Sequence, residues 1–133
     1  MVNEFASVNK YIPQREPFIM ISRLSGVSDN TASSALDITN ENIFVKDGYF
    51  QEAGIIENIA QTAAAMTGYH AIANNNEVKR GYLGAIKNLK INNLPKVNSQ
   101  IETSITIENT VMNVYYYIRE SRCRKAILLQ SAK

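Results

Sequence analysis

The sequence predicts an α+β domain in which a curved, mostly antiparallel sheet of about six strands wraps one long central helix. Three observations support this class. Residues Gln51 to Asn74 form the one segment long and apolar enough for a buried helix. Two strand-like segments precede it and four follow it. The chain has 133 residues and no internal repeat, so we expect a single domain over residues 1–133.

Two strands are expected before the helix. The segment YIPQREP predicts an extended loop, because Pro13 and Pro17 restrict their own backbone and that of the residues before them. After this loop we predict a central strand at 18–24, a turn at Gly26 and Asp29-Asn30, a returning strand at 31–39, and a loop at 40–48.

The helix carries two distinct stripes when its residues are placed at steps of 100°. Most apolar side chains fall on one arc: Ile55, Ile56, Ile59, Ala60, Ala63, Met66 and His70. The second stripe pairs two polar residues with two very small ones: Glu57, Gln61, Ala64 and Gly68. We expect the first stripe to pack in the core and the second to meet substrate or another subunit.

Four strands are expected after the helix, at 80–91, 100–109, 112–121 and 123–131. Polar and apolar residues alternate clearly in the second and third of these segments. Because the connections between the last three are short, we predict an antiparallel meander.

Composition excludes several functional classes. The net charge of +2 is too small to indicate nucleic-acid binding, and no apolar run approaches the roughly 20 residues of a membrane span. One histidine and one cysteine do not make a zinc site, and the glycines form no phosphate-binding loop, so we expect neither metal nor cofactor. The single cysteine and the absence of a leader-like start favour the cytoplasm.

Three stretches resemble the hotdog-fold 3-hydroxyacyl-carrier-protein dehydratase family. YIPQREPFIMISRL is similar to that family's opening motif, GIIENIAQTAAAMTGY to its helix, and RGYLGAIKNLKINN to the following strand. The sequence AQTAAAMTGYH is closest to the divergent dehydratase-like subunits of aryl polyene clusters.

The resemblance implies a hotdog fold and a homodimer or heterodimer that binds acyl carrier protein or an acyl-CoA thioester. It assigns acid–base catalysis to Glu57. It implies that the backbone N–H of Gly54 or Ile55 donates a hydrogen bond to the thioester carbonyl, and that Gln61 and Gly84 are further substrate contacts. A helix start offers free N–H donors to a developing oxyanion, which makes this assignment chemically reasonable.

The sequence also departs from the family pattern. Tyr49 stands where the family has its catalytic histidine, and Gln14 replaces a second histidine. A phenol is a poor base at neutral pH, so we expect Tyr49 to be an auxiliary donor. His70 lies roughly 20 Å along the helix from Glu57 and cannot pair with it within one subunit.

Three functions therefore remain open at this stage. The chain is a dehydratase acting on 3-hydroxyacyl thioesters, a catalytically degenerate subunit that partners an active dehydratase, or an acyl thioesterase that uses Glu57 to activate water. A basic zone that includes Lys87 and Lys96 could meet the acidic surface of a carrier protein.

Overall fold

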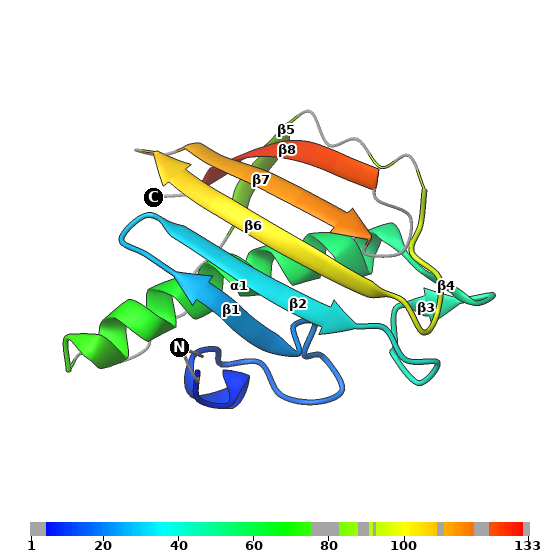
Figure 1. The fold of residues 1–133 in the computed structure, drawn as a ribbon, viewed down its shortest axis with the longest axis horizontal. Helices are drawn as coiled ribbons and strands as arrows, with labels where there is room; N and C mark the ends of the chain where they lie inside the picture. Colours follow the sequence, from blue (N-terminus) through cyan, green and yellow to red (C-terminus); the bar gives the residue numbers. More distant parts are fainter. Residues whose placement is uncertain are drawn as a thin grey trace.

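The computed structural model describes residues 5–75, 83–87, 91, 93–108, 111–118 and 123–131. One long helix lies against one face of a twisted sheet, and a short hairpin sits beside the start of the helix (Figure 1). The elements in chain order are η1 Val8–Lys10, β1 Arg23–Val27, β2 Thr31–Asp37, β3 Val45–Lys46, β4 Tyr49–Phe50, α1 Glu52–Ala73, β5 Leu83–Lys87, β6 Gln100–Glu108, β7 Val111–Ile118 and β8 Cys123–Ser131.

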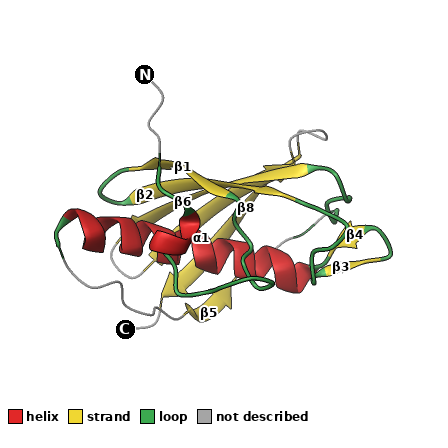
Figure 2. Ribbon diagram, turned by 90° about the horizontal axis from the view of Figure 1, so that it is seen from below, coloured by secondary structure: helices red, strands yellow, loops and turns green. Residues whose placement is uncertain are grey.

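The large sheet has six strands in the order β1-β2-β6-β7-β8-β5, and every neighbouring pair is antiparallel. The predicted meander is confirmed, because β6, β7 and β8 pair in sequence over all but one end residue of β6 and one of β8. Figure 2 shows the two layers, with α1 crossing beneath the sheet. The predicted α+β class, a helix packed on a mostly antiparallel sheet, is therefore correct.

The helix has the extent that the sequence predicts, with Gln51 as its N-cap and Asn74 as its C-cap. Four residues of its first stripe pack in the main core, where Ile55 and Ile59 have at most 1% of their surface exposed: Ile55, Ile59, Ala63 and Met66. The other three residues of the stripe are only half-buried and lie outside this core. The sheet side of this core consists mainly of β6 and β7 residues: Ile101, Ile105, Met112, Val114, Tyr116 and Ile118. Within the described ranges, no helix has both the length and the apolar character that crossing a membrane requires.

The second stripe meets the chain's own N-terminal segment, which corrects part of our expectation for this face. Gly68 is buried, and a Cβ added to it would lie 1.9 Å from the carbonyl oxygen of Tyr11. Gln61 is fully buried beside the extended segment around Phe18 and Met20. Because Gly68 has no side chain, the backbone of Tyr11 can approach the helix closely.

The predicted strand at 18–24 is wrong, because β1 begins only at Arg23. The backbone N–H and C=O of Met20 bond to the side chains of Gln61 and Asn58 instead of to a neighbouring strand. We call residues 18–22 the strap, because this extended segment crosses α1 and is held by these side chains.

Three smaller predictions also need adjustment. Gly26 lies inside β1 at a register shift, and the turn is formed by residues 28–30. The expected loop at 40–48 contains β3 and leads into a two-residue hairpin turn, where Asp47 and Gly48 have φ values of 54° and 83°. Of the strand expected at 80–91, the structure describes Leu83–Lys87 as β5, and most of the remainder lies outside the described residues.

Candidate functional site

Glu57 lies in the second turn of α1 and is partly exposed. Its Oε1 accepts a hydrogen bond of 2.9 Å from Nε2 of Gln61, one helical turn later. The same nitrogen donates to the carbonyl oxygen of Phe18 at 2.8 Å. The shared Gln61 amide therefore holds the carboxylate beside the strap, where Phe18 is 58% exposed.

The amide of Gln61 is used completely by contacts within the chain. Its Nε2 serves Phe18 and Glu57, and its Oε1 accepts the N–H of Met20 at 2.6 Å. With no exposed surface, Gln61 presents nothing to a ligand in this structure. The substrate contact that the family resemblance implies for Gln61 thus has no support in the geometry.

Asn58 supports the other side of the strap. Its Nδ2 donates to the carbonyl oxygen of Met20 at 2.8 Å, and its Oδ1 accepts a bond of 2.7 Å from Thr103 of β6. Thr62 of the next turn bonds to Ser34 of β2 at 2.7 Å. These polar side chains lie between α1 and its neighbours and are all buried, so the helix face next to the Glu57 stripe is anchored on both the strap and the sheet.

The N–H groups of Gly54 and Ile55 both point back into the helix start. They donate to the carbonyl oxygen of Gln51 at 3.0 and 3.2 Å. Gly54 is buried against Phe50, whose ring would lie 2.5 Å from an added Cβ. Within the described part of the chain, the exposed residues Glu52 and Ala53 have helix-start N–H groups without a partner, so the donors available to a ligand are one or two residues earlier than expected.

Tyr49 lines a cavity whose described walls do not include Glu57. It is 40% exposed in β4 and lines a cavity of about 390 Å³ whose other walls are Asn93, Leu94, Pro95, Lys96, Ser99 and Ile118. Glu57 is absent from this lining. Among the described residues, the cavity at Tyr49 is thus formed without Glu57.

His70 is also remote from Glu57, as the sequence indicates. Its Nε2 lies 2.8 Å from the carbonyl oxygen of Ser28, and its ring contacts that of Tyr69. Gly84 lies in β5 at the register shift between Leu83 and Ala85, opposite the end of β8. Among the described residues, no group of three His, Cys, Asp or Glu side chains is placed to hold a metal ion.

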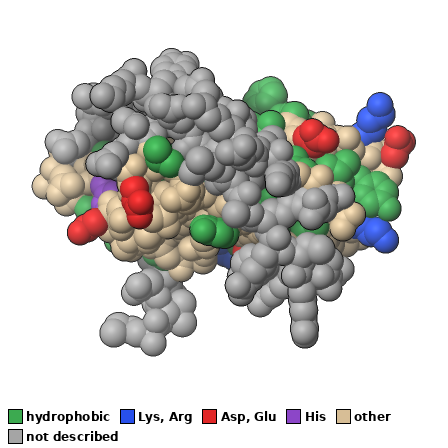
Figure 3. Space-filling view, turned by 90° about the horizontal axis from the view of Figure 1, so that it is seen from above, with side chains coloured by type: hydrophobic (Ala, Val, Ile, Leu, Met, Phe, Trp, Pro, Cys, Tyr) green, Lys and Arg blue, Asp and Glu red, His purple; other side chains and the backbone are tan. Residues whose placement is uncertain are grey.

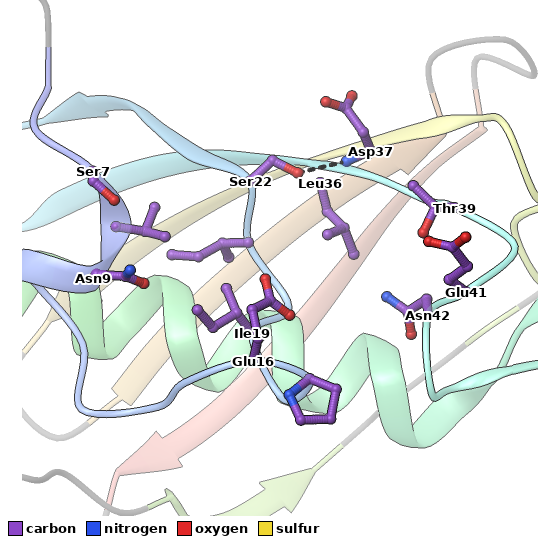
Figure 4. Close-up of a pocket in the computed structure, with 13 residues that line it drawn as sticks. Ser7, Asn9, Glu16, Ile19, Ser22, Leu36, Asp37, Thr39, Glu41 and Asn42 are labelled. Atoms are coloured by element: carbon purple, nitrogen blue, oxygen red, sulfur yellow. Dashed lines mark hydrogen bonds between the residues drawn. The ribbon is translucent and has the colours of Figure 1, made fainter.

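A larger groove, of about 740 Å³, lies beside the strap (Figure 4). The sequence did not indicate it. It lies between η1, residues 16–22 and the end of β2 with the loop that follows. Ile19, Ile21 and Leu36 form its apolar wall, and Glu16 and Glu41 stand at its rim. The hydrogen bond of 2.9 Å from the N–H of Asp37 to Ser22 closes one side.

Comparison with solved structures confirms the hotdog fold. The chain is similar to a component of the dehydratase heterocomplex ApeI:P from Xenorhabdus doucetiae, with a TM-score of 0.83 and 14% identity over 98% of this chain and 93% of that chain. It is also similar to Cj0977, a sigma28-regulated virulence protein from Campylobacter jejuni, with a TM-score of 0.65 and 15% identity over 93% of this chain and 84% of that one.

The uncharacterized protein PH1136 from Pyrococcus horikoshii shares the fold as well, with a TM-score of 0.63 and 12% identity over 97% of this chain and 96% of that chain. No curated protein matches the sequence. The model of the ApeP-like family, described as ApeP dehydratase, matches residues 6–120. Because this match spans most of the chain, which also has the expected fold, the protein belongs to the ApeP-like dehydratase family.

Proposed function

We propose that this chain is one subunit of a hotdog heterodimer that removes water from 3-hydroxyacyl thioesters carried by acyl carrier protein. One observation carries the proposal: Glu57 is held in place and partly exposed, while the only histidine of the chain is bonded to Ser28 at a distance from it. The chain thus supplies one half of an acid–base pair, and a partner subunit supplies the other.

The reaction needs two groups. A base takes the proton from the carbon next to the thioester carbonyl, and the hydroxyl on the following carbon leaves with a proton as water, so that a C=C bond forms. A histidine titrates near neutral pH and suits the first role. Glu57 is the group for the second role, moving a proton at the β-hydroxyl. The helix-start N–H groups of Glu52 and Ala53 are suitable donors to the thioester carbonyl.

A heterodimer fits these residues better than a homodimer. A second copy of this chain would bring only another His70, which already contacts the backbone of Ser28. A different hotdog subunit can bring a histidine to Glu57 across the interface. The similar protein from Xenorhabdus doucetiae is part of a dehydratase heterocomplex, which supports a heteromeric partner for this chain too.

The test compares the chain alone, a histidine-bearing hotdog subunit alone, and their mixture. Each is incubated with a 3-hydroxyacyl carrier thioester, and water loss is followed by mass spectrometry. We expect the mixture to be the active form, and Glu57→Gln to lower its rate about 100-fold or more, the usual contribution of a positioned acid or base. Glu108→Gln is the matched control, because Glu108 is exposed on β6.

Other outcomes identify the alternatives. Unchanged dehydration by the Glu57→Gln mixture would contradict the proposed role of Glu57 and leave a chain that only completes the fold of its partner. Release of free thiol from a saturated acyl thioester, lost in Glu57→Gln, would instead establish a thioesterase.

A further inference from the structure

The β3–β4 hairpin aligns two lysines with a tyrosine. Lys46 pairs with Tyr49 across the hairpin, and Tyr49 forms a bridge with Lys96 on its other side. Residues directly opposite on antiparallel strands project from the same face, with Cβ atoms about 4.5–5.5 Å apart. The two ammonium groups therefore flank one phenol in a single row, which we call the Lys46–Tyr49–Lys96 row.

The backbone under this row is held by four hydrogen bonds. The side chain of Gln51 donates to the carbonyl oxygens of Tyr49 at 2.8 Å and Lys46 at 3.2 Å. The N–H of Phe50 donates to Pro95, and the N–H of Val97 donates to Gly48, at 2.8 and 3.0 Å. The row is thus built before any ligand arrives, which lowers the entropic cost of binding.

The positive charges of the row are available to a ligand. Lys46 and Lys96 are both exposed, and neither forms an ion pair within the described part of the chain. The nearest acidic residue in the sequence, Asp47, lies in the hairpin turn. Figure 3 shows basic, acidic and hydrophobic side chains together at the end of the molecule that holds this hairpin.

A cavity with both polar and apolar walls adjoins the row. Tyr49 and Lys96 belong to the lining of the 390 Å³ cavity, together with Leu94, Pro95 and Ile118. A ligand that fits both features carries an anion at one end and a less polar chain at the other. Lysine ammonium groups bind phosphate as point charges, and a phenol adds a neutral hydrogen-bond donor.

We propose that the Lys46–Tyr49–Lys96 row binds the phosphate ester at the end of a pantetheine arm. This inference rests on the proposed function, because carrier-protein thioesters and CoA thioesters both carry that group. Gln51 connects the row directly to the start of α1, and the cavity that Tyr49 and Lys96 line gives an arm anchored here space to extend. Tyr49 then recognises the substrate through its hydroxyl and transfers no proton.

Calorimetry with pantetheine 4′-phosphate and with pantetheine tests the site without any turnover. We expect the phosphate form to bind the full chain more tightly, and Lys46→Gln with Lys96→Gln to weaken it at least tenfold while leaving pantetheine unaffected. Lys10→Gln, an exposed lysine of η1, is the control for a lost charge and is compared with Lys96→Gln alone. Equal binding of the two ligands by the unaltered chain would overturn the proposal.

Kinetics of the active mixture separate this proposal from the proposed function. The double variant should raise KM at least tenfold for carrier and CoA thioesters, and leave it unchanged for an N-acetylcysteamine thioester, which lacks the phosphate. Dehydration without this selective effect would overturn the site and keep the function. Phosphate-dependent binding without dehydration would keep the site and remove the function. An effect confined to the carrier thioester would identify the carrier's acidic surface as the ligand, which contradicts the proposal.

Discussion

Replacing Gln61 with leucine should cost the fold about 2–4 kcal/mol of unfolding free energy. The change leaves the N–H of Met20, a residue 1% exposed, without its 2.6 Å acceptor, and an unsatisfied buried donor costs about 1–3 kcal/mol. The carbonyl of Phe18 loses a donor too, but it is partly exposed and water can replace the bond, so this part is nearer 1 kcal/mol.

Urea denaturation followed by circular dichroism, at one fixed protein concentration, measures this loss. Thr67→Val is the matched control on the same helix, since it removes an exposed side-chain bond and should change stability by less than about 0.5 kcal/mol. Asn58→Leu releases the other side of Met20, so we expect the double variant with Gln61→Leu to cost less than the two single changes added together. A Gln61→Leu protein within about 0.5 kcal/mol of the original would refute the strap as a fixed element.

Two further predictions concern packing and charge. Gly68→Ala should destabilise the protein by about 1–3 kcal/mol despite the better helix propensity of alanine, because its Cβ would overlap the Tyr11 carbonyl. Gly26→Ala is the control and should be close to neutral, because the space around its Cβ is open. Equal unfolding midpoints for the two variants would contradict the contact between Gly68 and Tyr11. Asp37→Asn weakens the 3.0 Å pair with Arg23 but keeps an oxygen that can accept the 2.6 Å bond from Gln100. Because both side chains of the pair are about half exposed, the loss measured by urea denaturation should stay under about 1 kcal/mol, and a larger loss would contradict this reasoning.

The parts of the fold that the sequence predicts well are those with a local signal. The apolar periodicity of α1 and the alternation in β6 and β7 repeat within a few residues, and their positions agree with the structure to within one to three residues. The strand predicted at 18–24 has an equally apolar pattern, yet the backbone of Met20 in it bonds to amides 38 and 41 residues later, and pairing with β2 starts only near its end. An extended segment looks the same in sequence whether a strand or a side chain satisfies its backbone.

The candidate site divides in the same way. Glu57 and Gln61 are one helical turn apart, so their contact follows from sequence spacing. The use of Gln61 against Phe18 and Met20 does not follow, because it depends on tertiary packing of a distant segment. Lys96 lies 47 positions after Tyr49 in the sequence, and the two are brought together only by the bridge between the hairpin and the segment before β6. No sequence pattern near either residue therefore predicts the row.

The hydrogen bonds also distinguish which residue of the helix motif can report on catalysis. Gln61 is needed by the fold, since it holds the strap at two backbone groups. Glu57 accepts one bond from the Gln61 amide. When the Glu57 carboxylate is removed, Nε2 of Gln61 still donates one hydrogen to Phe18, and water can reach its second hydrogen because this side is only partly buried. A loss of activity in a Gln61 variant therefore has a structural explanation, whereas a loss in Glu57→Gln, with stability unchanged, has only a chemical one.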